Sequence, residues 1–217
     1  MTQFTVRSPL ATALTLCLFE GDAETRLPMV RAGEDWVLDT PAPPGTRYGF
    51  RADGAWSPET GHWFDPSKFL VDPRAVELDQ RFVQDPRLAR FGVDTADIVP
   101  KAVVPKPLPD LERRPPLFTR GGLIYELNVR GFTMLHPDVP EAQRGTVAAL
   151  AHPAIIAHLK ALHVSAVELM PITAWIDERH LPPLGLSNAW GYNPVAMMAL
   201  DPGLCPAGVA ELREAAA

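Results

Sequence analysis

The fold of the second half of this 217-residue chain is decided by the stretch Gly121-Gly-Leu-Ile-Tyr-Glu-Leu-Asn-Val-Arg-Gly-Phe-Thr133. It is an apolar segment that ends in the polar side chains of Asn128, Arg130 and Thr133. A strand buried on both faces has this apolar composition, and the carboxyl end of a strand in a parallel α/β barrel delivers polar groups to a site. The stretch therefore predicts a barrel strand over Leu123–Val129.

The sequence after this strand alternates helix and strand signals. Pro153 stands where the first residue of a helix is expected, and Ile155, Ile156, Leu159 and Leu162 follow at helical spacing. Further strands are predicted over Val164–Ile172 and Val195–Leu200, and a further helix over residues 209–217. Strands that alternate with helices indicate a parallel sheet with right-handed crossovers. A complete barrel needs about 250 residues, so we expect an incomplete (β/α)8 TIM barrel over residues 118–217.

The first 99 residues have a different pattern, in which short apolar runs are separated by turn residues. The runs are Leu14–Phe19, Trp36–Leu38, Arg47–Arg51 and Phe69–Val71. This spacing predicts an immunoglobulin-like β-sandwich. Six prolines between Pro100 and Pro116 exclude a helix there and favour an extended linker over residues 100–117. The expected fold class is multi-domain, β plus α/β.

Composition narrows the class of partner. The net charge of −6 provides no basic stripe to neutralise phosphates, which excludes nucleic acid and favours an uncharged polymer or small molecule. Cys17 and Cys205 lie too far apart in sequence for a metal-ligand spacing, and we interpret both as buried. No apolar run is long enough to span a membrane. Leu10–Phe19 resembles a short signal sequence, but its alternating pattern favours a strand, and we expect a cytoplasmic protein.

Several motifs together resemble bacterial glycogen debranching enzymes of the isoamylase type, in the α-amylase superfamily (glycoside hydrolase family 13). They are Tyr48–Gly54, Gly61–Pro73, Pro100–Val104, Tyr125–Thr133, Leu135–Glu141, Arg144–Thr146, Glu178–Leu181 and Trp190–Asn193. The resemblance implies an amino-terminal module related to glycan-binding domains, followed by the start of a catalytic barrel. Its implied activity is hydrolysis of α-1,6-glucosidic branch links in glycogen, a branched α-glucan, without a cofactor or metal. Asn128 departs from the family's usual histidine, and His163 from a glycine that adopts a left-handed turn.

The candidate site residues are Tyr192, Asn193 and Arg130, all of which we assign to substrate binding. Tyr192 follows a glycine at the mouth of a predicted barrel strand, where an aromatic ring can stack on a sugar face. The resemblance places it at the sugar that is cleaved. Arg130 and Asn193 could hydrogen-bond near the site, although arginine after a strand is equally often a structural ion-pair partner.

No residue is assigned a catalytic role. Retaining hydrolysis needs two carboxyl groups about 5 to 5.5 Å apart. The family's nucleophile aspartate, acid/base glutamate and third aspartate lie on later strands, and the carboxylates available here have no convincing catalytic context. They are Glu126, Glu168, Asp177, Glu178 and Asp201. We therefore expect the chain alone to be inactive.

Three tryptophans of the first half could form a glycan platform, but a structural role is favoured. Trp36 lies in an alternating run and is predicted to be core, whereas Trp56 and Trp63 are predicted to pack the sandwich against the barrel. Two alternative functions stay open. One is a non-catalytic α-glucan-binding protein, and the other is a fragment of a related glucan branching or trehalose-releasing enzyme. The loop Leu135–Glu141 favours debranching.

Overall fold

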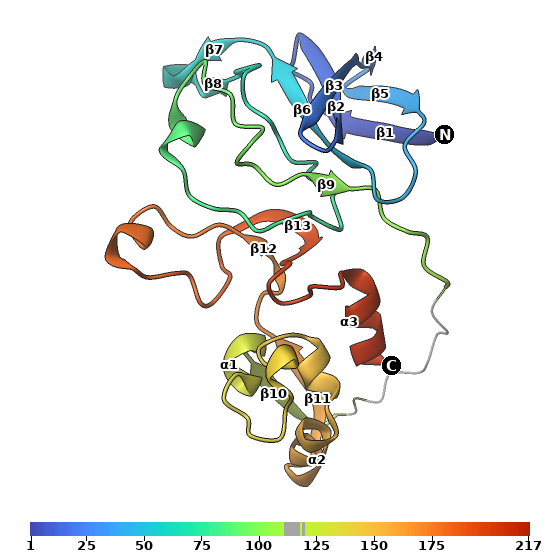
Figure 1. The fold of residues 1–217 in the computed structure, drawn as a ribbon, viewed down its shortest axis with the longest axis vertical. Helices are drawn as coiled ribbons and strands as arrows, with labels where there is room; N and C mark the ends of the chain where they lie inside the picture. Colours follow the sequence, from blue (N-terminus) through green and yellow to red (C-terminus); the bar gives the residue numbers. More distant parts are fainter. Residues whose placement is uncertain (111–117, 119) are drawn as a thin grey trace.

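The computed structural model describes residues 1–110, 118 and 120–217. The first half folds into two facing antiparallel sheets (Figure 1). One sheet has the order β1-β5-β4, and the other has the order β3-β2-β6-β9. The strands are β1 Thr2–Arg7, β2 Ala13–Glu20, β3 Ala23–Pro28, β4 Val30–Ala32, β5 Asp35–Thr40, β6 Arg47–Asp53, β7 Trp56–Ser57, β8 His62–Trp63 and β9 Ala102–Val103. The predicted β-sandwich is confirmed.

The central strand β2 is buried on both faces because its alternating side chains enter two separate clusters. Leu14 and Leu16 point into the core between the sheets, which also holds Trp36 as predicted. Cys17 points the other way, into a smaller cluster with Phe69. Burial in this second cluster raises the pKa of the Cys17 thiol to about 12, so the thiol stays protonated and behaves as a small hydrophobic group.

The second cluster is covered by residues 64–101, which we call the strap. It contains one short 3-10 helix, η2 (Pro86–Ala89), and the strand predicted over Phe69–Val71 is reduced to a single bridge between Leu70 and Phe50. Close approach of the strap to β6 requires Gly49, because a Cβ there would lie 2.6 Å from the carbonyl oxygen of Leu70 and would overlap the Phe69 ring.

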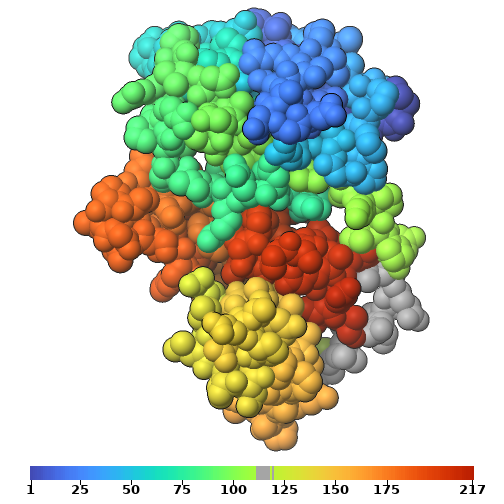
Figure 2. Space-filling view, in the orientation of Figure 1, coloured from blue at the N-terminus to red at the C-terminus, as the bar shows by residue number. Residues whose placement is uncertain are grey.

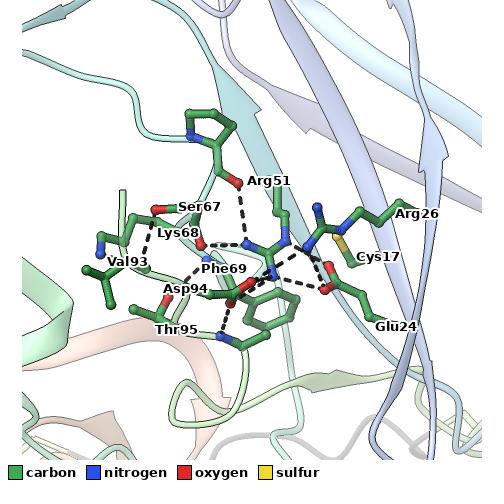
Figure 3. Close-up of polar contacts among 12 residues, drawn as sticks. Cys17, Glu24, Arg26, Arg51, Ser67, Lys68, Phe69, Val93, Asp94 and Thr95 are labelled. Atoms are coloured by element: carbon green, nitrogen blue, oxygen red, sulfur yellow. Dashed lines mark hydrogen bonds and ion pairs between the residues drawn. The ribbon is translucent and has the colours of Figure 1, made fainter. Parts of the chain in front are cut away.

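Polar side chains fasten the strap where regular hydrogen bonding is missing (Figure 3). The buried guanidinium of Arg51 on β6 donates to both carboxylate oxygens of Glu24 at 2.7 and 2.9 Å, to Asp94 at 2.9 and 3.0 Å, and to the carbonyl oxygen of Ser67 at 2.5 Å. The ammonium of Lys68 donates to the carbonyl oxygens of Arg87, Arg90 and Val93. Arg51 therefore joins the strap to the sheet, and Lys68 joins two segments of the strap to each other.

The predicted linker, residues 100–117, begins inside the sandwich. Strand β9 pairs with Arg47 and Tyr48 of β6, and Val104 donates a backbone hydrogen bond to Thr46. Proline at position 100 is compatible with this arrangement because it precedes the paired residues of β9, so that its missing N–H removes no hydrogen bond to β6. The sheet thus continues past the predicted boundary at residue 99, and residues 111–117 of the linker lie outside the described residues.

The second half begins with a parallel pair, β10 (Leu123–Leu127) and β11 (Val164–Leu169), joined through α1 (Val129–Thr133) and α2 (Pro153–Ala161). The helix predicted to start at Pro153 does start there. The remaining elements are η1 Pro58–Thr60, η3 Glu141–Gln143, η4 Ala148–Ala151, β12 Thr173–Trp175, η5 Pro182–Leu184, β13 Pro194–Leu200 and α3 Val209–Ala216. His163, in the turn after α2, has φ +56, the left-handed conformation expected from its position.

The third predicted strand does not join the parallel pair. Instead, β13 pairs antiparallel with β12, and Ala174, Ala196 and Ala199 of this hairpin belong to the core of the sandwich (Figure 1). Two parallel neighbouring strands must be joined by a crossover, which is usually a helix. Residues 176–193, which join β12 to β13, contain only the short 3-10 helix η5. The expectation of a third parallel strand was wrong for this reason.

Candidate functional site

The carboxyl ends of β10 and β11 open into a cavity of about 160 Å³, which we call the strand-end pocket. Its lining includes Asn128, Arg130, Pro171, Trp175, Asn188 and Asp201, together with Arg81 from the strap. Asn128 caps α1 by accepting a hydrogen bond from the Gly131 amide at 2.8 Å, and its own amide donates to the carbonyl oxygen of Ala189 at 2.9 Å. The residue that departs from the family's histidine therefore joins the end of β10 to the loop 176–193.

Arg130 is the only one of the three predicted binding residues that lines this pocket. Its side chain is exposed, and within residues 1–110, 118 and 120–217 it forms no ion pair with a carboxylate. The structural ion pair considered from the sequence is therefore not observed in the described part of the chain, and a binding role for Arg130 stays a prediction.

Tyr192 lies outside the pocket, on the loop 176–193 that projects from one side of the molecule (orange in Figure 2). Tyr192 is 62% exposed, and Trp190 is 66% exposed. The two rings have centroids 6.4 Å apart and planes inclined at 67°. We call them the aromatic pair. Sequence reasoning missed Trp190, although its signal, a second aromatic residue two positions earlier in the same motif, was present.

Asn193 closes the same loop. Its side-chain amide donates to the carbonyl oxygen of Ile176 at 2.8 Å, and its own carbonyl oxygen accepts the Ile176 amide at 3.2 Å. Both ends of the loop are thereby joined, which fixes the direction in which the chain leaves β12 and enters β13. A substrate contact by Asn193 stays a prediction.

Asp201, at the end of β13, is 1% exposed and forms the polar centre of the pocket. Its carboxylate accepts hydrogen bonds from the Gly203 amide at 2.9 Å and from Nε of Arg81 at 3.0 Å. The Arg81 guanidinium also lies 4.8 Å from the centre of the Trp175 ring. Burial nevertheless raises the pKa of Asp201 above its ordinary value. The strap of the sandwich thus supplies a wall of the pocket in the second half.

The other candidate carboxylates have structural surroundings. Glu126 and Glu168 are exposed neighbours in register on the parallel pair. Asp177 and Glu178 accept hydrogen bonds from the backbone and side-chain amides of Asn188, at 2.8 and 3.0 Å respectively. Among the described residues, no group of three or more His, Cys, Asp or Glu side chains could hold a metal ion. Within the same residues, no helix is sufficiently long and apolar to cross a membrane.

A second candidate surface lies on the sandwich, at the hairpin formed by β7 and β8. Trp56 and Trp63 are cross-strand partners with ring centroids 5.5 Å apart, and Phe91 of the strap lies 4.3 Å from the Trp56 ring. We call these three side chains the sandwich cluster. Trp63 is 65% exposed and lines a groove of about 610 Å³, whose other walls include Leu10 and Leu70.

Trp56 and Trp63 were predicted to pack the sandwich against the barrel. In the structure, the sandwich cluster does not pack against the second half. Hairpin β7–β8 lies at the end of the sandwich opposite β10 and β11 (Figure 1). The surface that contacts the second half is instead the strap, through Arg81 and through Gln84, which donates to the carbonyl oxygen of Asp177 at 2.6 Å. The exposed tryptophans are therefore free to meet a ligand.

Comparison with known proteins identifies the class of the sandwich. Residues 1–75 match the family model of carbohydrate-binding module 48, described as the isoamylase N-terminal domain. The chain is 43% identical over 225 residues to a glycogen debranching enzyme of Yersinia pseudotuberculosis, and 42% identical over 224 residues to one of Yersinia enterocolitica. Each alignment covers 97% of this chain and 34% of the relative. The chain thus spans about a third of the length of these relatives and is homologous to the amino-terminal region of glycogen debranching enzymes.

Solved structures share the fold. A pullulanase from Anoxybacillus sp. LM18-11, complexed with maltotetraose, superposes with a TM-score of 0.63 at 22% identity, over 98% of this chain and 30% of that chain. The catalytic module of the glycogen-degrading pneumococcal virulence factor SpuA superposes with a TM-score of 0.66 at 19% identity, over 93% of this chain and 30% of that chain. At these identities the likeness concerns the fold alone.

Proposed function

We propose that this chain is the amino-terminal part of a cytoplasmic glycogen debranching hydrolase that cleaves α-1,6-glucosidic branch links. Residues 1–99 are the glucan-binding sandwich, residues 100–117 the linker and residues 118–217 the first strands and helices of a TIM barrel. The 43% identity to glycogen debranching enzymes supports the activity, and the parallel pair β10–β11 supports the barrel. Buried, unpaired Cys17 and Cys205 are consistent with a reducing compartment.

The observation that carries a binding function in this chain is the sandwich cluster beside its groove. An exposed tryptophan offers a flat π face to the C–H groups of a pyranose, and a neighbouring groove can accept further sugar units. Trp63 lies at the border of both, because it contacts Trp56 and lines the groove. Arg7 and His62 also line the groove and can hydrogen-bond to sugar hydroxyls.

Binding is the function proposed for this chain, and hydrolysis is reserved for the whole enzyme. Catalysis requires two carboxyl groups in different protonation states, and binding alone does not accelerate a reaction. Asp177, Glu178 and Asp201 are engaged in hydrogen bonds that hold the loop and the pocket. The second candidate is a non-catalytic α-glucan-binding protein. The sandwich cluster and its groove favour this candidate over a branching or trehalose-releasing enzyme, because they can bind glucan without catalytic carboxylates.

Binding is tested by calorimetric titration of the full chain with maltoheptaose. Trp63→Ala should weaken binding about tenfold, which corresponds to about 1.4 kcal/mol of lost stacking. Val30→Ala is the matched control, because Val30 is also an exposed side chain of the sandwich but lies on β4. Equal affinities for wild type and Trp63→Ala would reject the sandwich cluster as the binding surface.

Hydrolysis is tested separately by incubating the chain with glycogen and measuring new reducing ends. The expected result is no turnover above a buffer control. Turnover that disappears in Glu126→Gln or Glu168→Gln would show that this exposed carboxylate pair is catalytic.

A further inference from the structure

The carboxylate at the end of β6 makes a backbone contact that differs from those of other aspartates in the chain. Five described aspartates accept a hydrogen bond from the backbone amide two residues ahead, which is the usual geometry of an aspartate turn. They are Asp65, Asp72, Asp85, Asp94 and Asp201. Asp53 instead accepts a hydrogen bond from the amide of the next residue, Gly54, at 2.8 Å. Its carboxyl group therefore lies against the peptide nitrogen that follows it.

This contact brings together the two groups that form a succinimide, the five-membered ring made when a backbone nitrogen attacks the carboxyl carbon of the preceding aspartate. Glycine obstructs the attack least, because it has no Cβ. Asp53 is exposed, and it is the only aspartate of the 217-residue chain that is followed by glycine. Four of the five aspartates with the usual geometry precede proline, whose nitrogen carries no hydrogen and cannot close the ring. Asp53 therefore combines a favourable sequence with a favourable contact.

We propose that Asp53–Gly54 is a modification site, at which the backbone rearranges spontaneously from aspartate to isoaspartate. In the first step the lone pair of the Gly54 nitrogen forms a bond to Cγ of Asp53, and the carboxyl hydroxyl leaves with the amide proton as water. In the second step water adds to the backbone carbonyl carbon of Asp53 and breaks its bond to the Gly54 nitrogen, which takes up a proton. The main chain then runs through Cγ, and the former backbone carbonyl becomes a free carboxylate. The water lost is regained, so the mass of the chain is unchanged.

The surroundings of Asp53 make this rearrangement costly for the fold. Its carbonyl oxygen accepts the amide of Thr12 at 2.8 Å, and Asp53 is paired with Ala13 of β2. Isoaspartate lengthens the main chain between β6 and Gly54 by one methylene carbon. Gly54 has little space for a shift, because a Cβ on it would lie 2.7 Å from the ring of Phe64. The added length is therefore taken up by hairpin β7–β8, which carries two tryptophans of the sandwich cluster (Figure 1).

The test incubates the full chain at pH 7 and physiological temperature. Peptide mass spectrometry detects the succinimide by its loss of water, and enzymatic methylation of the new free carboxylate detects isoaspartate. Conversion at Asp53 should be about ten times faster than at Asp94, whose side chain is 55% exposed but whose carboxylate is turned to the amide two residues ahead. Asp53→Glu should abolish the signal, since glutamate would have to close a six-membered ring. Asp53→Asn should accelerate it, because ammonia leaves in place of water.

A matched variant separates the contact from the sequence. Ala23→Gly creates a second aspartate–glycine pair at Asp22, in the exposed turn between β2 and β3, where residue 23 is paired with Glu20. Asp22 should convert more slowly than Asp53 within the same protein. Guanidinium chloride provides the second comparison. The folded chain should convert Asp53 no more slowly than the unfolded chain, because the fold already holds the carboxyl group at the nitrogen.

Each outcome decides one step of the proposal. Absence of succinimide and isoaspartate at Asp53 would overturn the modification site itself. Equal conversion of Asp22 and Asp53 in Ala23→Gly, or slower conversion in the folded than in the unfolded chain, would overturn the role of the contact with Gly54. The converted chain, separated by ion-exchange chromatography, should melt at a lower temperature than the unconverted chain. Equal melting temperatures would overturn the displacement of hairpin β7–β8.

Discussion

Replacing Arg51 with methionine is the sharpest test of how the sandwich is held together. The Arg51 side chain is 3% exposed, and its guanidinium donates hydrogen bonds to Glu24, Asp94 and the carbonyl oxygen of Ser67 (Figure 3). Methionine retains most of the apolar volume but removes every donor. Glu24, whose side chain is 14% exposed, would then lose both hydrogen bonds from Arg51 and keep its contacts with Arg26 and Cys17. Removal of one partner from a buried ion pair typically costs about 3 to 5 kcal/mol.

The pKa of Glu24 gives a second measure of the free energy that this ion pair contributes to folding. Burial raises this pKa, but hydrogen bonds from Arg51 and Arg26 outweigh it and lower the pKa from 4.5 to about 2. At about 1.4 kcal/mol for each pKa unit, the pairing stabilises the folded state by about 3 kcal/mol above pH 4.5. Because the folded-state pKa is depressed, this contribution is lost as the pH falls from 4.5 through 2. At pH 3 about 1.4 kcal/mol remains.

The assay is urea unfolding followed by circular dichroism at pH 7 and pH 3. Arg51→Met should lower the free energy of unfolding by at least about 3 kcal/mol at pH 7 and by clearly less at pH 3. Arg26→Met is the matched control, because Arg26 contacts the same carboxylate oxygen at 3.0 Å from a side chain that is 52% exposed. It should cost less than about 1 kcal/mol. Equal losses for the two variants, or a loss for Arg51→Met that does not change with pH, would refute the reasoning.

Three further outcomes are expected. Gly49→Ala should destabilise the sandwich by about 1 to 3 kcal/mol in the same assay, since its new methyl group overlaps the Phe69 ring; wild-type stability would contradict this. Arg81→Met removes the cation beside buried Asp201, which raises the already elevated pKa of that carboxyl further. The variant should therefore lose stability relative to wild type as the pH rises above about 4. Thermal melts of both proteins from pH 3 to pH 7 show whether the difference in stability grows with pH. Residues 1–110 alone should melt cooperatively but at a lower temperature than the sandwich in the full chain, while residues 118–217 alone should aggregate; a soluble, cooperatively melting 118–217 with no melt for 1–110 would reverse this.

Sequence patterns predicted those elements whose burial has a regular period. The alternation in β2 was recognised because its buried side chains recur at nearly every second residue. The apolar runs of β10 and β11 were recognised from their composition, although most of their side chains are exposed or half-buried. Strand β3, Ala23-Glu-Thr-Arg-Leu-Pro28, was missed because it is an edge strand with mostly exposed side chains. The strap was also missed, since Arg51 and Lys68 hold it by contacts between residues far apart in sequence.

The candidate site was predicted in part for a similar reason. Tyr192 was identified because an aromatic residue after glycine is visible in one motif, and its exposure in the structure is consistent with that assignment. The contributions of Arg81 and Asn188 were not visible. Arg81 reaches Asp201 across 120 residues of sequence, and the role of Asn188 depends on where a loop without regular structure turns back. Neither relation leaves a periodic signal.

The placement of hairpin β12–β13 sets the order in which the protein can assemble during synthesis. The amino-terminal sheets are translated first, but Ala174, Ala196 and Ala199 complete their core. The nascent sandwich therefore keeps one apolar surface exposed to water until almost the whole chain described here has left the ribosome. Contacts between residues so distant in sequence form slowly. Chaperone binding to the nascent chain should consequently persist until residue 199 has emerged, and a ribosome stalled before residue 174 should display a sandwich that is more sensitive to protease than that of the full chain.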